Sequence, residues 1–403
     1  MITYFIMKGN EMKKIVIGIT GSIAIYKTCD LISLLNKKNY DIEVIMTNNA
    51  TKFINPITFG SLIHKPVLVD DFDETGYQIK HINIVKDASC FIIVPATANI
   101  IAKIAHGIAD DALSSSFLAA TCPKIIAPAM NVHMYENTAT QKNIDICKSY
   151  HIHFIEPTVG NLACGYQGKG HLAPLDDIVE YIEYVSNTHP LKGKHILITA
   201  GPTQEALDPV RYLTNHSSGK MGYALARAAR NLGAHVTLIS GPTNLKKPFG
   251  VDFINVQSAR DMFERIKEFM NFQDYIIMSA AVGDYRPKTY SDNKIKKHDD
   301  DMFLQLEKNP DILAYLGAHK TKQTICGFAM ETENVLENAK KKFINKNCDL
   351  LVVNDLFEDG AGFQTETNKV ALITKHFIDY LDLMSKEELA YKIIEKLMKI
   401  KGE

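Results

Sequence analysis

Two side chains in the first half of the chain have the chemistry of proton transfer. Cys164 lies in LACGYQGKG, a polar, glycine-rich segment in which a thiol has no apolar surface to bury against. The other six of the seven cysteines lie in apolar or helical contexts that suit buried free thiols, and no CxxC pair indicates zinc or a disulfide framework. His81, in KHINI, is a candidate acid or base near pH 7, or a satisfied surface residue.

Small and hydroxyl-bearing residues follow the apolar runs of the first half. GITGSIAIYK places Gly21 and Ser22 between an apolar run and a helix, where backbone N–H groups and the helix dipole hold phosphate. The spacing is not the six-residue dinucleotide fingerprint, so it favours a mononucleotide; tight packing without any ligand is the open alternative. Further polar candidates for the same sheet edge are Thr47, Thr97, Asn99 and Ser114.

Three segments of the second half could bind a nucleotide. DPVRYLTNHSSGKMG (208–222) is a polar loop leading into a Gly- and Ser-rich helix start, but it lacks the full GxxxxGK[ST] pattern and is not a P-loop. KIKKHDDD (294–301) is a charge run of the kind usually found in solvated turns. AKKKFINKNCD (339–349) places Lys342 and Lys346 four residues apart on one helix face. The pair could be an exposed basic stripe or could bind a triphosphate.

The elements that must position these residues alternate between strands and helices. Continuous apolar runs predict strands in the first half at 13–20, 42–47, 90–95 and 124–128, with a helix over 23–36. In the second half we expect strands at 195–200, 236–240, 275–280, 302–306, 350–353 and 370–374, a helix over 221–232, and a last helix with Ser385 at its N-cap. This alternation predicts an α/β protein with two Rossmann-like domains and mainly parallel sheets. The polar linker at 186–194 places the domains at 12–187 and 191–403.

Composition narrows the possible partners. The 403 residues are 46% hydrophobic and 23% charged, typical of a soluble globular protein of two or three domains. Lys and Arg (45) nearly balance Asp and Glu (46), so no net positive charge attracts nucleic acid. No apolar run reaches the 18 residues of a membrane span, and no signal peptide is apparent, so we expect a cytoplasmic protein with no nucleic-acid or membrane partner.

The first half resembles a known family in five segments that occur in the same order. GITGSIAIYK, KHINI, PATANIIAK, APAMNVHMY and LACGYQGKG are similar to the homo-oligomeric flavin-containing cysteine decarboxylases, specifically those that act on phosphopantothenoylcysteine. The resemblance implies a flavodoxin-like fold with bound FMN, His81 as the active-site base, Asn131 as a ligand of the substrate carboxylate, and Cys164 on a clamp over the site. Tyr135 stands where many members have Trp.

The chemistry explains why such a site needs these groups. Loss of CO2 from a cysteinyl carboxylate leaves an unstabilised carbanion, and FMN removes this obstacle by oxidising the thiol carbon to a thioaldehyde. The enethiol that results must be reduced and protonated. The pKa of a thiol such as Cys164 suits that proton donation.

The second half resembles the phosphopantothenate–cysteine ligases. The match is carried by ITAGPTQEALDPVRYLTNHSSGKMG, AAVGDYRP, KIKK, KNPDIL, GFAMET, the AxxKxxxKxxD spacing and VVND. It implies that Asn215 binds the reacting carboxylate and that Lys294 neutralises phosphate charge. Nucleotide contacts are implied for Asp284, Lys294, Pro310, Asp311, Ile312, Leu313, Phe328, Lys342 and Lys346, with Asp284 also near the metal. Arg211 is a candidate for the substrate phosphate, and Gly283 stands where Ala is commoner.

The implied reaction activates a carboxylate, which is a poor acyl donor. Activation as a mixed anhydride with CMP precedes attack by the amine of cysteine, and Mg2+ bridges the phosphates of the nucleotide. Bacterial members that carry both halves on one chain use CTP, so the fusion favours CTP over ATP.

Together the two resemblances predict a bifunctional enzyme of coenzyme A biosynthesis. It would ligate 4′-phosphopantothenate with L-cysteine and decarboxylate the product to 4′-phosphopantetheine. The alternatives are an FMN-binding regulatory protein of the phosphatase-inhibitor kind, a flavin prenyltransferase or reductase, and a fusion with one inactive domain. The families imply trimeric decarboxylase and dimeric ligase contacts, which a dodecamer would satisfy together.

Overall fold

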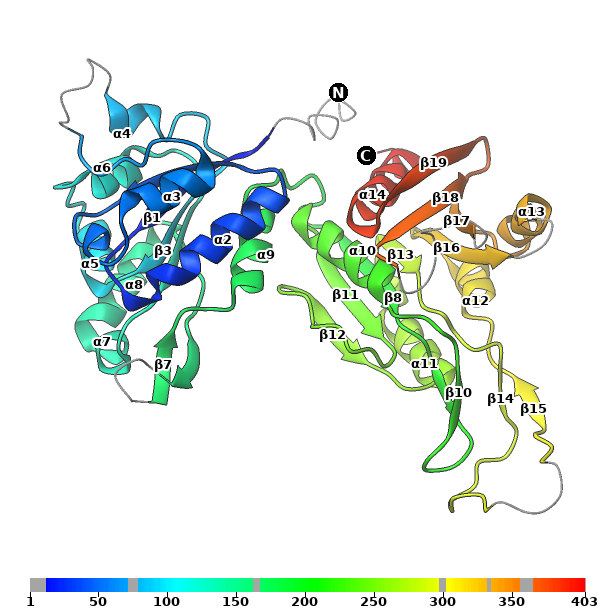
Figure 1. Ribbon diagram of the computed structural model, residues 1–403. Coiled ribbons are helices and arrows are strands. Elements are labelled where there is room, and N and C mark those ends of the chain that lie inside the picture. Colours follow the sequence, from blue (N-terminus) through cyan, green and yellow to red (C-terminus); the bar gives the residue numbers. More distant parts are fainter. Residues whose placement is uncertain are drawn as a thin grey trace. The chain divides into compact units, whose positions relative to one another are not determined.

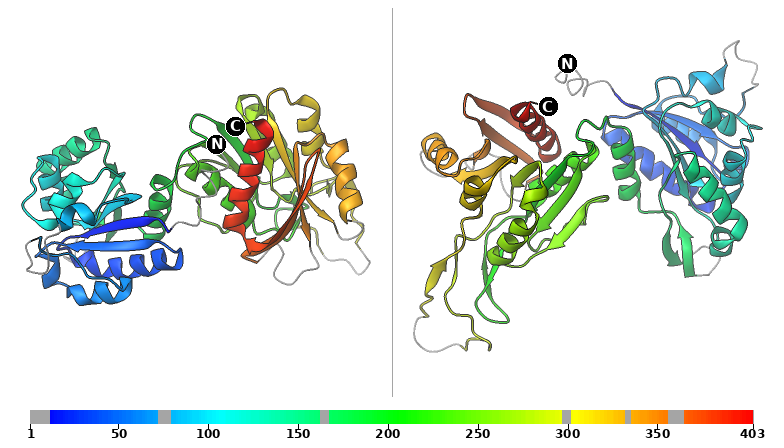
Figure 2. Two further views of the ribbon diagram at one scale, coloured as in Figure 1. Left: turned by 90° about the horizontal axis from the view of Figure 1, so that it is seen from above. Right: turned by 180° about the vertical axis from the view of Figure 1, so that it is seen from behind.

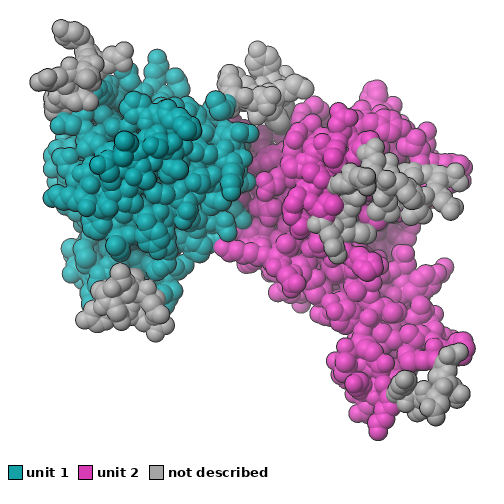
Figure 3. All heavy atoms as spheres, viewed as in Figure 1, with its two compact units in different colours: residues 1, 3–187 teal, residues 2, 188–403 magenta. Residues whose placement is uncertain are grey.

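The computed structural model describes residues 12–71, 79–161, 167–296, 302–331, 335–355 and 365–402. Contacts divide the chain into two compact units, the first ending at Asn187 and the second beginning at Thr188 (Figure 3). Each unit consists of a mainly parallel sheet with helices packed against it (Figure 1), so the predicted α/β class is confirmed. Among the described residues, no helix combines the length and apolar character needed to cross a membrane.

The first unit is built on a five-stranded sheet whose neighbouring strands are all parallel, in the order β2-β1-β3-β4-β5. Its strands are β1 (Lys14–Ile19), β2 (Asp41–Met46), β3 (Cys90–Ala96), β4 (Lys124–Pro128) and β5 (His153–Phe154). Every residue of β3 is buried, as the continuous apolar run predicts for a strand covered on both faces. Because the strands are parallel, the loops that follow them all leave from one edge.

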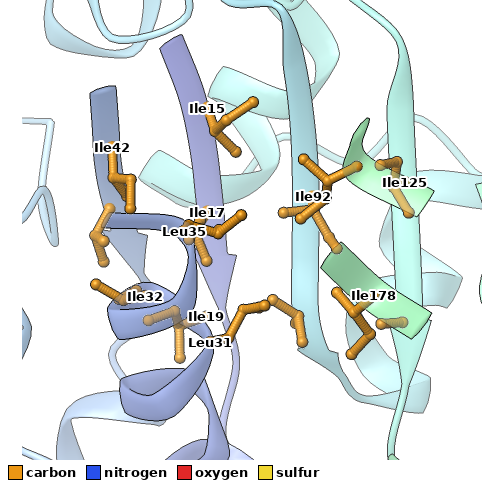
Figure 4. Close-up of a cluster of buried hydrophobic side chains, with 14 of the residues drawn as sticks. Ile15, Ile17, Ile19, Leu31, Ile32, Leu35, Ile42, Ile92, Ile125 and Ile178 are labelled. Atoms are coloured by element: carbon orange, nitrogen blue, oxygen red, sulfur yellow. The ribbon is translucent and has the colours of Figure 1, made fainter. Parts of the chain in front are cut away.

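Helices cover both faces of this sheet. One face packs against α2 (Tyr26–Lys37), α3 (Pro56–Ile63) and α9 (Leu175–Val185), and the other against α5 (Ala98–Ala105), α6 (Ala112–Ala119) and α8 (Thr138–Ser149). Figure 4 shows Ile17 and Ile19 of β1 beside Leu31 and Leu35 of α2, all fully buried. Burying a side chain of this size contributes about 1.5–3 kcal/mol to stability, so this packing fixes the position of α2 on the sheet.

Smaller elements lie around the edge from which the loops leave. They are the short helices α4 (Lys80–Asn83) and α7 (Val132–Glu136) and an antiparallel hairpin of β6 (Thr158–Asn161) and β7 (Gln167–His171). The helix predicted over 23–36 starts as a 3-10 turn, η2 (Ile23–Ile25), before α2 begins. Ser22 caps this turn by accepting the N–H of Ala24, which explains the displaced helix start.

The second unit contains an eight-stranded sheet in the order β12-β11-β8-β13-β16-β17-β18-β19. Its strands are β8 (His195–Ala200), β11 (His235–Ser240), β12 (Asp252–Asn255), β13 (Tyr275–Met278), β16 (Thr324–Glu331), β17 (Leu350–Asp355), β18 (Thr367–Ile373) and β19 (Ile378–Ser385). The pairs from β12 to β17 are parallel, and β18 and β19 extend the sheet antiparallel. The predicted strands here are confirmed except one, and β12, β16 and β19 were not predicted.

Helices pack on both faces of this sheet as well (Figure 2). They are α10 (Lys220–Asn231), α11 (Ala259–Phe269), α12 (Ile312–His319), α13 (Val335–Asn345) and α14 (Lys386–Lys401). Helices α11 and α12 share a core with Leu197 of β8, whereas α10 packs so closely on the opposite face that a Cβ at Gly222 would lie 2.5 Å from that of Ala200. As predicted, Ser385 caps α14, by accepting the N–H of Glu388.

Two short antiparallel ribbons complete this unit. They are formed by β9 (Gln204–Ala206) with β10 (Tyr212–Thr214), and by β14 (Tyr285–Pro287) with β15 (Leu306–Lys308). The strand predicted at 302–306 is wrong, because residues 302–305 have no strand conformation and β15 begins only at Leu306. The apolar run that suggested it is exposed, with Phe303 93% accessible, so no buried surface supports a strand there.

Candidate functional sites

A buried hydroxyl joins the loops at the edge of the first sheet. Thr20, directly after β1 and 2% exposed, donates its Oγ1 hydrogen to the Pro95 carbonyl at 2.7 Å and accepts the Thr97 N–H at 3.1 Å. Ser22 donates its hydroxyl to the Ala129 carbonyl, after β4, at 3.2 Å. The loops after three strands are therefore held together without a ligand. The sequence did not single out Thr20, because its partners lie more than 70 residues away.

Gly21 makes a close approach between two of these loops. A Cβ at Gly21 would lie 3.1 Å from the Cβ of Asn49 and 3.2 Å from its carbonyl oxygen, so a larger residue would separate the loops after β1 and β2. Thr47, at the end of β2, donates its N–H to the Ile19 carbonyl at 3.0 Å. The structure thus brings Gly21, Ser22 and Thr47 to one edge, where their backbone could approach a phosphate.

The remaining predicted flavin residues lie on two helices. Thr97 is the N-cap of α5, and Asn99 is exposed in the first turn of that helix. Ser114 also has a local role that was not predicted, because its 2% exposed side chain forms the capping box of α6 with Asp111, at 2.8 Å between Ser114 Oγ and Asp111 Oδ1. Its hydroxyl is therefore committed to the start of α6.

Asn131 lies three residues after the end of β4, as the N-cap of α7, and accepts the His133 N–H at 2.8 Å. The hairpin of β6 and β7 is attached to the same loop, since the Met130 N–H donates to the Gly170 carbonyl at 3.0 Å. A Cβ at Gly170 would lie 2.3 Å from the Met130 oxygen, which requires glycine there. Cys164 falls between the two hairpin strands, outside the described residues.

A carboxylate missed by the sequence analysis anchors this hairpin. Glu156 accepts the Tyr135 hydroxyl at 2.7 Å and pairs with Lys169 of β7 at 2.9 Å and Lys148 of α8 at 3.3 Å. Burial alone would raise the pKa of Glu156, but these partners outweigh it and lower the pKa to about 2. Tyr135 therefore links α7 to the carboxylate that holds β7.

His81 is the third predicted residue of the decarboxylase chemistry. It lies on α4, which packs against α6, and its side chain is 31% exposed. Its Nδ1 lies 3.2 Å from Oδ2 of Asp71, a residue that the sequence analysis did not identify.

In the second unit, glycines allow three loops to meet at the edge of the sheet. Gly201 follows β8 and Gly219 caps α10, and both have left-handed φ angles, of +74° and +79°. A Cβ on either would lie 2.8 Å from Cγ2 of Thr243, in the loop after β11. The first N–H groups of α10 therefore start at this edge, an arrangement that suits phosphate.

Asn215 spans from the loop before α10 to the loop after β13. Its Nδ2 donates to the carbonyls of Ala281 at 3.1 Å and Val282 at 3.3 Å. Thr203 strengthens the same junction by accepting the Gly283 N–H at 2.9 Å. The side chain implied to bind the reacting carboxylate is thus fixed at the end of the central strands.

The loop after β13 also contacts the segment that opens α12. Asn309 donates its backbone N–H to the Asp284 carbonyl at 2.9 Å and its Nδ2 to the Gly283 carbonyl at 2.8 Å. Asp284 is exposed and Pro310 half-buried, and Asp311 caps α12 by accepting the Ala314 N–H at 2.9 Å. This brings the predicted residues Asp284 and Pro310–Leu313 together.

Phe328 is adjacent to that group. It is half-buried on β16, and β13 ends opposite the preceding residue, Gly327. A Cβ at Gly327 would lie 2.7 Å from Cδ2 of Leu313, so α12 packs directly against this part of β16. Successive side chains of a strand point to opposite faces, so the Phe328 ring leaves β16 on the face away from α12, next to the point where β13 ends.

Two lysines add positive charge to this edge. Lys346 follows α13 by one residue, donates its N–H to the Lys342 carbonyl at 2.9 Å, and forms an ion pair with Asp311. Burial would raise the pKa of Asp311, but Lys346, the cap hydrogen bond and the charge of Lys342 together lower it. Both lysines therefore act on the carboxylate at the start of α12.

Asp208 organises the segment of Lys294. Its fully buried carboxylate accepts the Ile295 N–H at 3.1 Å and binds the Arg211 guanidinium at 2.7 Å; Arg211 also donates to the Ile295 carbonyl at 2.6 Å. Burial would raise the pKa of Asp208, but three backbone N–H groups and Arg211 hold it well below its usual range. The structure thus commits Arg211, predicted as a phosphate ligand, to holding the segment of the exposed Lys294.

In the part of the chain that the structure describes, no three His, Cys, Asp or Glu side chains group as metal ligands. Near the residues implied to bind a nucleotide, Asp284 offers one exposed carboxylate. That donor set suits a Mg2+ ion carried mainly by phosphate oxygens rather than an all-protein site.

Comparison with known proteins gives relatives for both halves. Residues 7–187 match the family described as Flavoprotein, and residues 191–400 match the DNA/pantothenate metabolism flavoprotein C-terminal domain. The coenzyme A biosynthesis bifunctional protein CoaBC of Bacillus subtilis is 46% identical over 392 residues, or 96% of each chain.

Two further relatives match long parts of the chain. A cysteine/cysteine sulfinic acid decarboxylase from an unknown prokaryotic organism is 44% identical over 86% of this chain and 99% of its own. The crystal structure of the C-terminal domain of a coenzyme A biosynthesis bifunctional protein CoaBC is 43% identical, covers 54% of this chain and 100% of its own, and has a TM-score of 0.46.

Proposed function

The chain belongs to the family of bifunctional coenzyme A biosynthesis proteins, and from this premise we propose how its two sites work. It is an enzyme of two consecutive steps. The C-terminal half ligates 4′-phosphopantothenate with L-cysteine, and the N-terminal half decarboxylates 4′-phosphopantothenoylcysteine to 4′-phosphopantetheine. The observation that carries the proposal is that, in each half, side chains far apart in sequence meet at the carboxyl edge of a parallel sheet, where such folds bind ligands.

In the ligase half, Asn215 binds the carboxylate of 4′-phosphopantothenate. One of its amide hydrogens turns from the Ala281 or Val282 carbonyl, 3.1 and 3.3 Å away, to the substrate oxygen. That oxygen attacks the α-phosphorus of CTP, pyrophosphate leaves, and an acyl-cytidylate forms. The amine of cysteine then displaces CMP. Lys294 neutralises phosphate charge during activation, and Asp208 and Arg211 hold its segment through Ile295.

The nucleotide lies along the start of α12. Phe328 and the segment Pro310–Leu313 contact the base, and Lys342 and Lys346 bind the phosphates. Lys346 exchanges its ion pair with Asp311 for the incoming phosphate. Asp284 would help to hold the Mg2+ that accompanies CTP, and that ion would screen the charge of the phosphates.

In the decarboxylase half, the loops at the edge of the first sheet fit a flavin mononucleotide. The support is the close backbone approach at Gly21 and the loop junction at Thr20, which leave N–H groups and hydroxyls of Ser22, Thr47 and Thr97 near one another. These residues and Asn99 would hold FMN. When bound, FMN supplies the oxidation of the cysteinyl thiol that makes loss of CO2 possible and the later reduction of the product.

The protein's own side chains bind the substrate and move protons. Asn131 binds the carboxylate that will leave as CO2, His81 takes the proton that substrate oxidation releases, and Cys164 returns a proton to the product carbon. The hairpin that carries Cys164 is attached to the Asn131 loop through Met130 and Gly170.

A second candidate substrate for the flavin half is free cysteine or its sulfinic acid. The relative named for that activity covers 86% of this chain. The two candidates differ in the phosphopantothenoyl arm, so decarboxylation of free L-cysteine at a rate comparable to that of 4′-phosphopantothenoylcysteine would favour the second.

We infer a homo-oligomer from the family, with trimeric contacts between decarboxylase halves and dimeric contacts between ligase halves, both satisfied by a dodecamer. Light scattering of the FMN-loaded protein would give the mass of twelve chains. A monomer with full activity would contradict this assembly.

One assay tests both halves and the nucleotide. Purified full-length protein is incubated with 4′-phosphopantothenate, L-cysteine, Mg2+ and either CTP or ATP, and the products are measured by mass spectrometry. We expect CMP and 4′-phosphopantetheine with CTP and much less product with ATP. Accumulation of 4′-phosphopantothenoylcysteine would mean an inactive decarboxylase half, and no product with either nucleotide would contradict the proposal and favour an FMN-binding regulatory protein.

A further inference from the structure

His81 is paired with a second ionisable side chain that the proposed mechanism does not use. Nδ1 of His81 lies 3.2 Å from Oδ2 of Asp71, ten residues earlier in the chain. The geometry is that of a ring N–H donating to a carboxylate. The two side chains differ in accessibility, since that of His81 is 31% exposed and that of Asp71 only 13%.

The burial of Asp71 is unusual for a carboxylate in a loop. Its other oxygen, Oδ1, is buried and has no hydrogen-bond partner among the described residues. Burying a carboxylate oxygen costs stability, so stability alone would favour an apolar residue or an exposed carboxylate at this place. An arrangement that costs stability indicates a role for the carboxylate, and its contact with the proposed base identifies that role.

Separate elements hold the two partners. The segment before Asp71 runs beside β2, with the Leu68 N–H donating to the Val44 carbonyl at 3.0 Å and the Met46 N–H donating to the Leu68 carbonyl at 2.8 Å. It therefore ends at the same sheet edge as Thr47. His81 comes from α4, which packs against α6. Because the two residues are fixed independently, the carboxylate can orient the ring.

We propose that Asp71 is a positioning residue for decarboxylation, acting through His81; this rests on the proposed role of His81. By accepting the Nδ1 hydrogen, Asp71 selects the tautomer whose Nε2 has a lone pair and directs that nitrogen away from the loop, toward substrate. When Nε2 takes a proton, the adjacent carboxylate stabilises the imidazolium that forms. Asp71 itself touches neither substrate nor flavin in this proposal.

Asp71→Asn removes the charge and keeps the size of the side chain. We expect kcat for decarboxylation of 4′-phosphopantothenoylcysteine to fall about 10- to 100-fold, the range seen for residues that orient functional histidines. KM should stay within about two-fold, because substrate binding is untouched. Flavin absorbance per chain and the thermal midpoint should match the wild type, which excludes misfolding. Asp70→Asn, at the exposed neighbouring carboxylate, is the matched control and should retain full kcat.

A double-mutant cycle separates positioning from a general structural effect. If Asp71 acts through His81, Asp71→Asn in a His81→Gln background should lower kcat no further than His81→Gln alone. A further fall of the same size as in the wild-type background would overturn the inference and assign Asp71 a structural role. A normal kcat for Asp71→Asn alone would also overturn it while leaving the proposed role of His81 intact. A normal kcat for His81→Gln would instead contradict the proposed mechanism itself, and the inference with it.

Discussion

The two candidate sites lie at equivalent edges of similar sheets but are held together by different forces. In the first unit, neutral hydrogen bonds centred on the buried hydroxyl of Thr20 join the loops after β1 and β3, and the charge pairs of Glu156 act only at the hairpin. In the second unit, charge pairs add to such bonds, between Lys346 and Asp311 and between Arg211 and Asp208. The Thr20 junction thus consists of uncharged groups, whereas the second edge carries charge that a ligand can replace.

This difference matches what each site must do. A resident flavin needs a cradle whose backbone groups are already in place, since every reorganisation would weaken its retention. A nucleotide triphosphate enters and leaves in each turnover, and a lysine already paired with a carboxylate can exchange that partner for a phosphate. Removing a hydroxyl from the first edge should therefore weaken the retention of its ligand. Removing a carboxylate from the second edge should instead strengthen the binding of its ligand.

The largest expected effect concerns the neutral edge. Thr20→Val keeps the side-chain shape but leaves the Pro95 carbonyl and the Thr97 N–H without their partner. Two such losses cost about 2–4 kcal/mol, and the thermal midpoint of the flavin half should fall by about 5–10 °C with faster FMN loss. Flavin fluorescence during heating measures both. Ser61→Ala, which removes an exposed hydroxyl on α3, should change neither, and an unchanged Thr20→Val protein would contradict the account of this edge.

At the charged edge, the two partners of one ion pair should have opposite effects. Lys346→Gln removes a charged hydrogen bond to phosphate, so the ligase kcat/KM for nucleotide should fall about 10- to 100-fold. Asp311→Asn keeps a residue that caps helices well but removes the carboxylate that competes with the phosphate for Lys346. The nucleotide KM should therefore fall by up to about 5-fold. Steady-state release of pyrophosphate measures both.

Lys341→Gln is the matched control for this pair of variants. Lys341 is 65% exposed on α13 and pairs with Glu337, so the ligase rate should be unchanged. A higher nucleotide KM in Asp311→Asn would mean that Asp311 binds the nucleotide directly and does not compete with it.

A smaller effect distinguishes two glycines of the second unit. Gly283 has room for a methyl group, because a Cβ there would lie 3.4 Å from its nearest neighbour, Cγ of Glu205. The φ angle of Gly283 is not left-handed. Gly283→Ala should stabilise the ligase half by about 0.4–1 kcal/mol through the unfolded state. Gly201→Ala should instead destabilise it by about 1–2 kcal/mol, because φ is +74° and Thr243 lies 2.8 Å away. Urea unfolding measures the two, and equal shifts would contradict the loop geometry.

The smallest effect concerns the hairpin anchor. Glu156 has a lowered pKa, about 2 against an ordinary 4.5, so its contribution to stability is complete above about pH 4.5 and is lost as the pH falls toward 2. The side chain is 48% exposed, and solvent screening keeps the contribution small. The difference in thermal midpoint between wild type and Glu156→Gln should be constant from pH 5 to 7 and shrink below pH 4.5. A difference that grows on acidification would contradict the anchor.

The sequence predicted best those features that depend on local pattern. Buried parallel strands such as β3 and β8 appear as uninterrupted apolar runs, so their positions were predicted to within about two residues. The wrong strand at 302–306 was suggested by a mostly apolar segment that is exposed, so no sheet covers it. Strand β19 was missed because it is largely exposed and mixes polar with apolar residues.

The residues missed at the sites have distant partners. Asp208 contacts Ile295, 87 residues further on, and Thr20 contacts Pro95, 75 residues further on. Nothing in the local sequence marks these residues as junctions between loops. Ser114 shows the converse, because its place among hydroxyls suggested a ligand contact, and the structure adds a local role that was not predicted, the cap of α6. Local chemistry thus predicted which residues reach the edge, and tertiary contacts decide what holds them there.

The most direct test of two independent sites on one chain is a supplementation assay with Asn215→Asp. The new carboxylate would face the carbonyls of Ala281 and Val282, and it would repel the substrate carboxylate. We expect no product from 4′-phosphopantothenate, cysteine and CTP. Supplied with 4′-phosphopantothenoylcysteine and no nucleotide, the same protein should form 4′-phosphopantetheine at the wild-type rate. Loss of that second reaction in a folded, FMN-loaded protein would contradict the assignment of the two steps to separate sites.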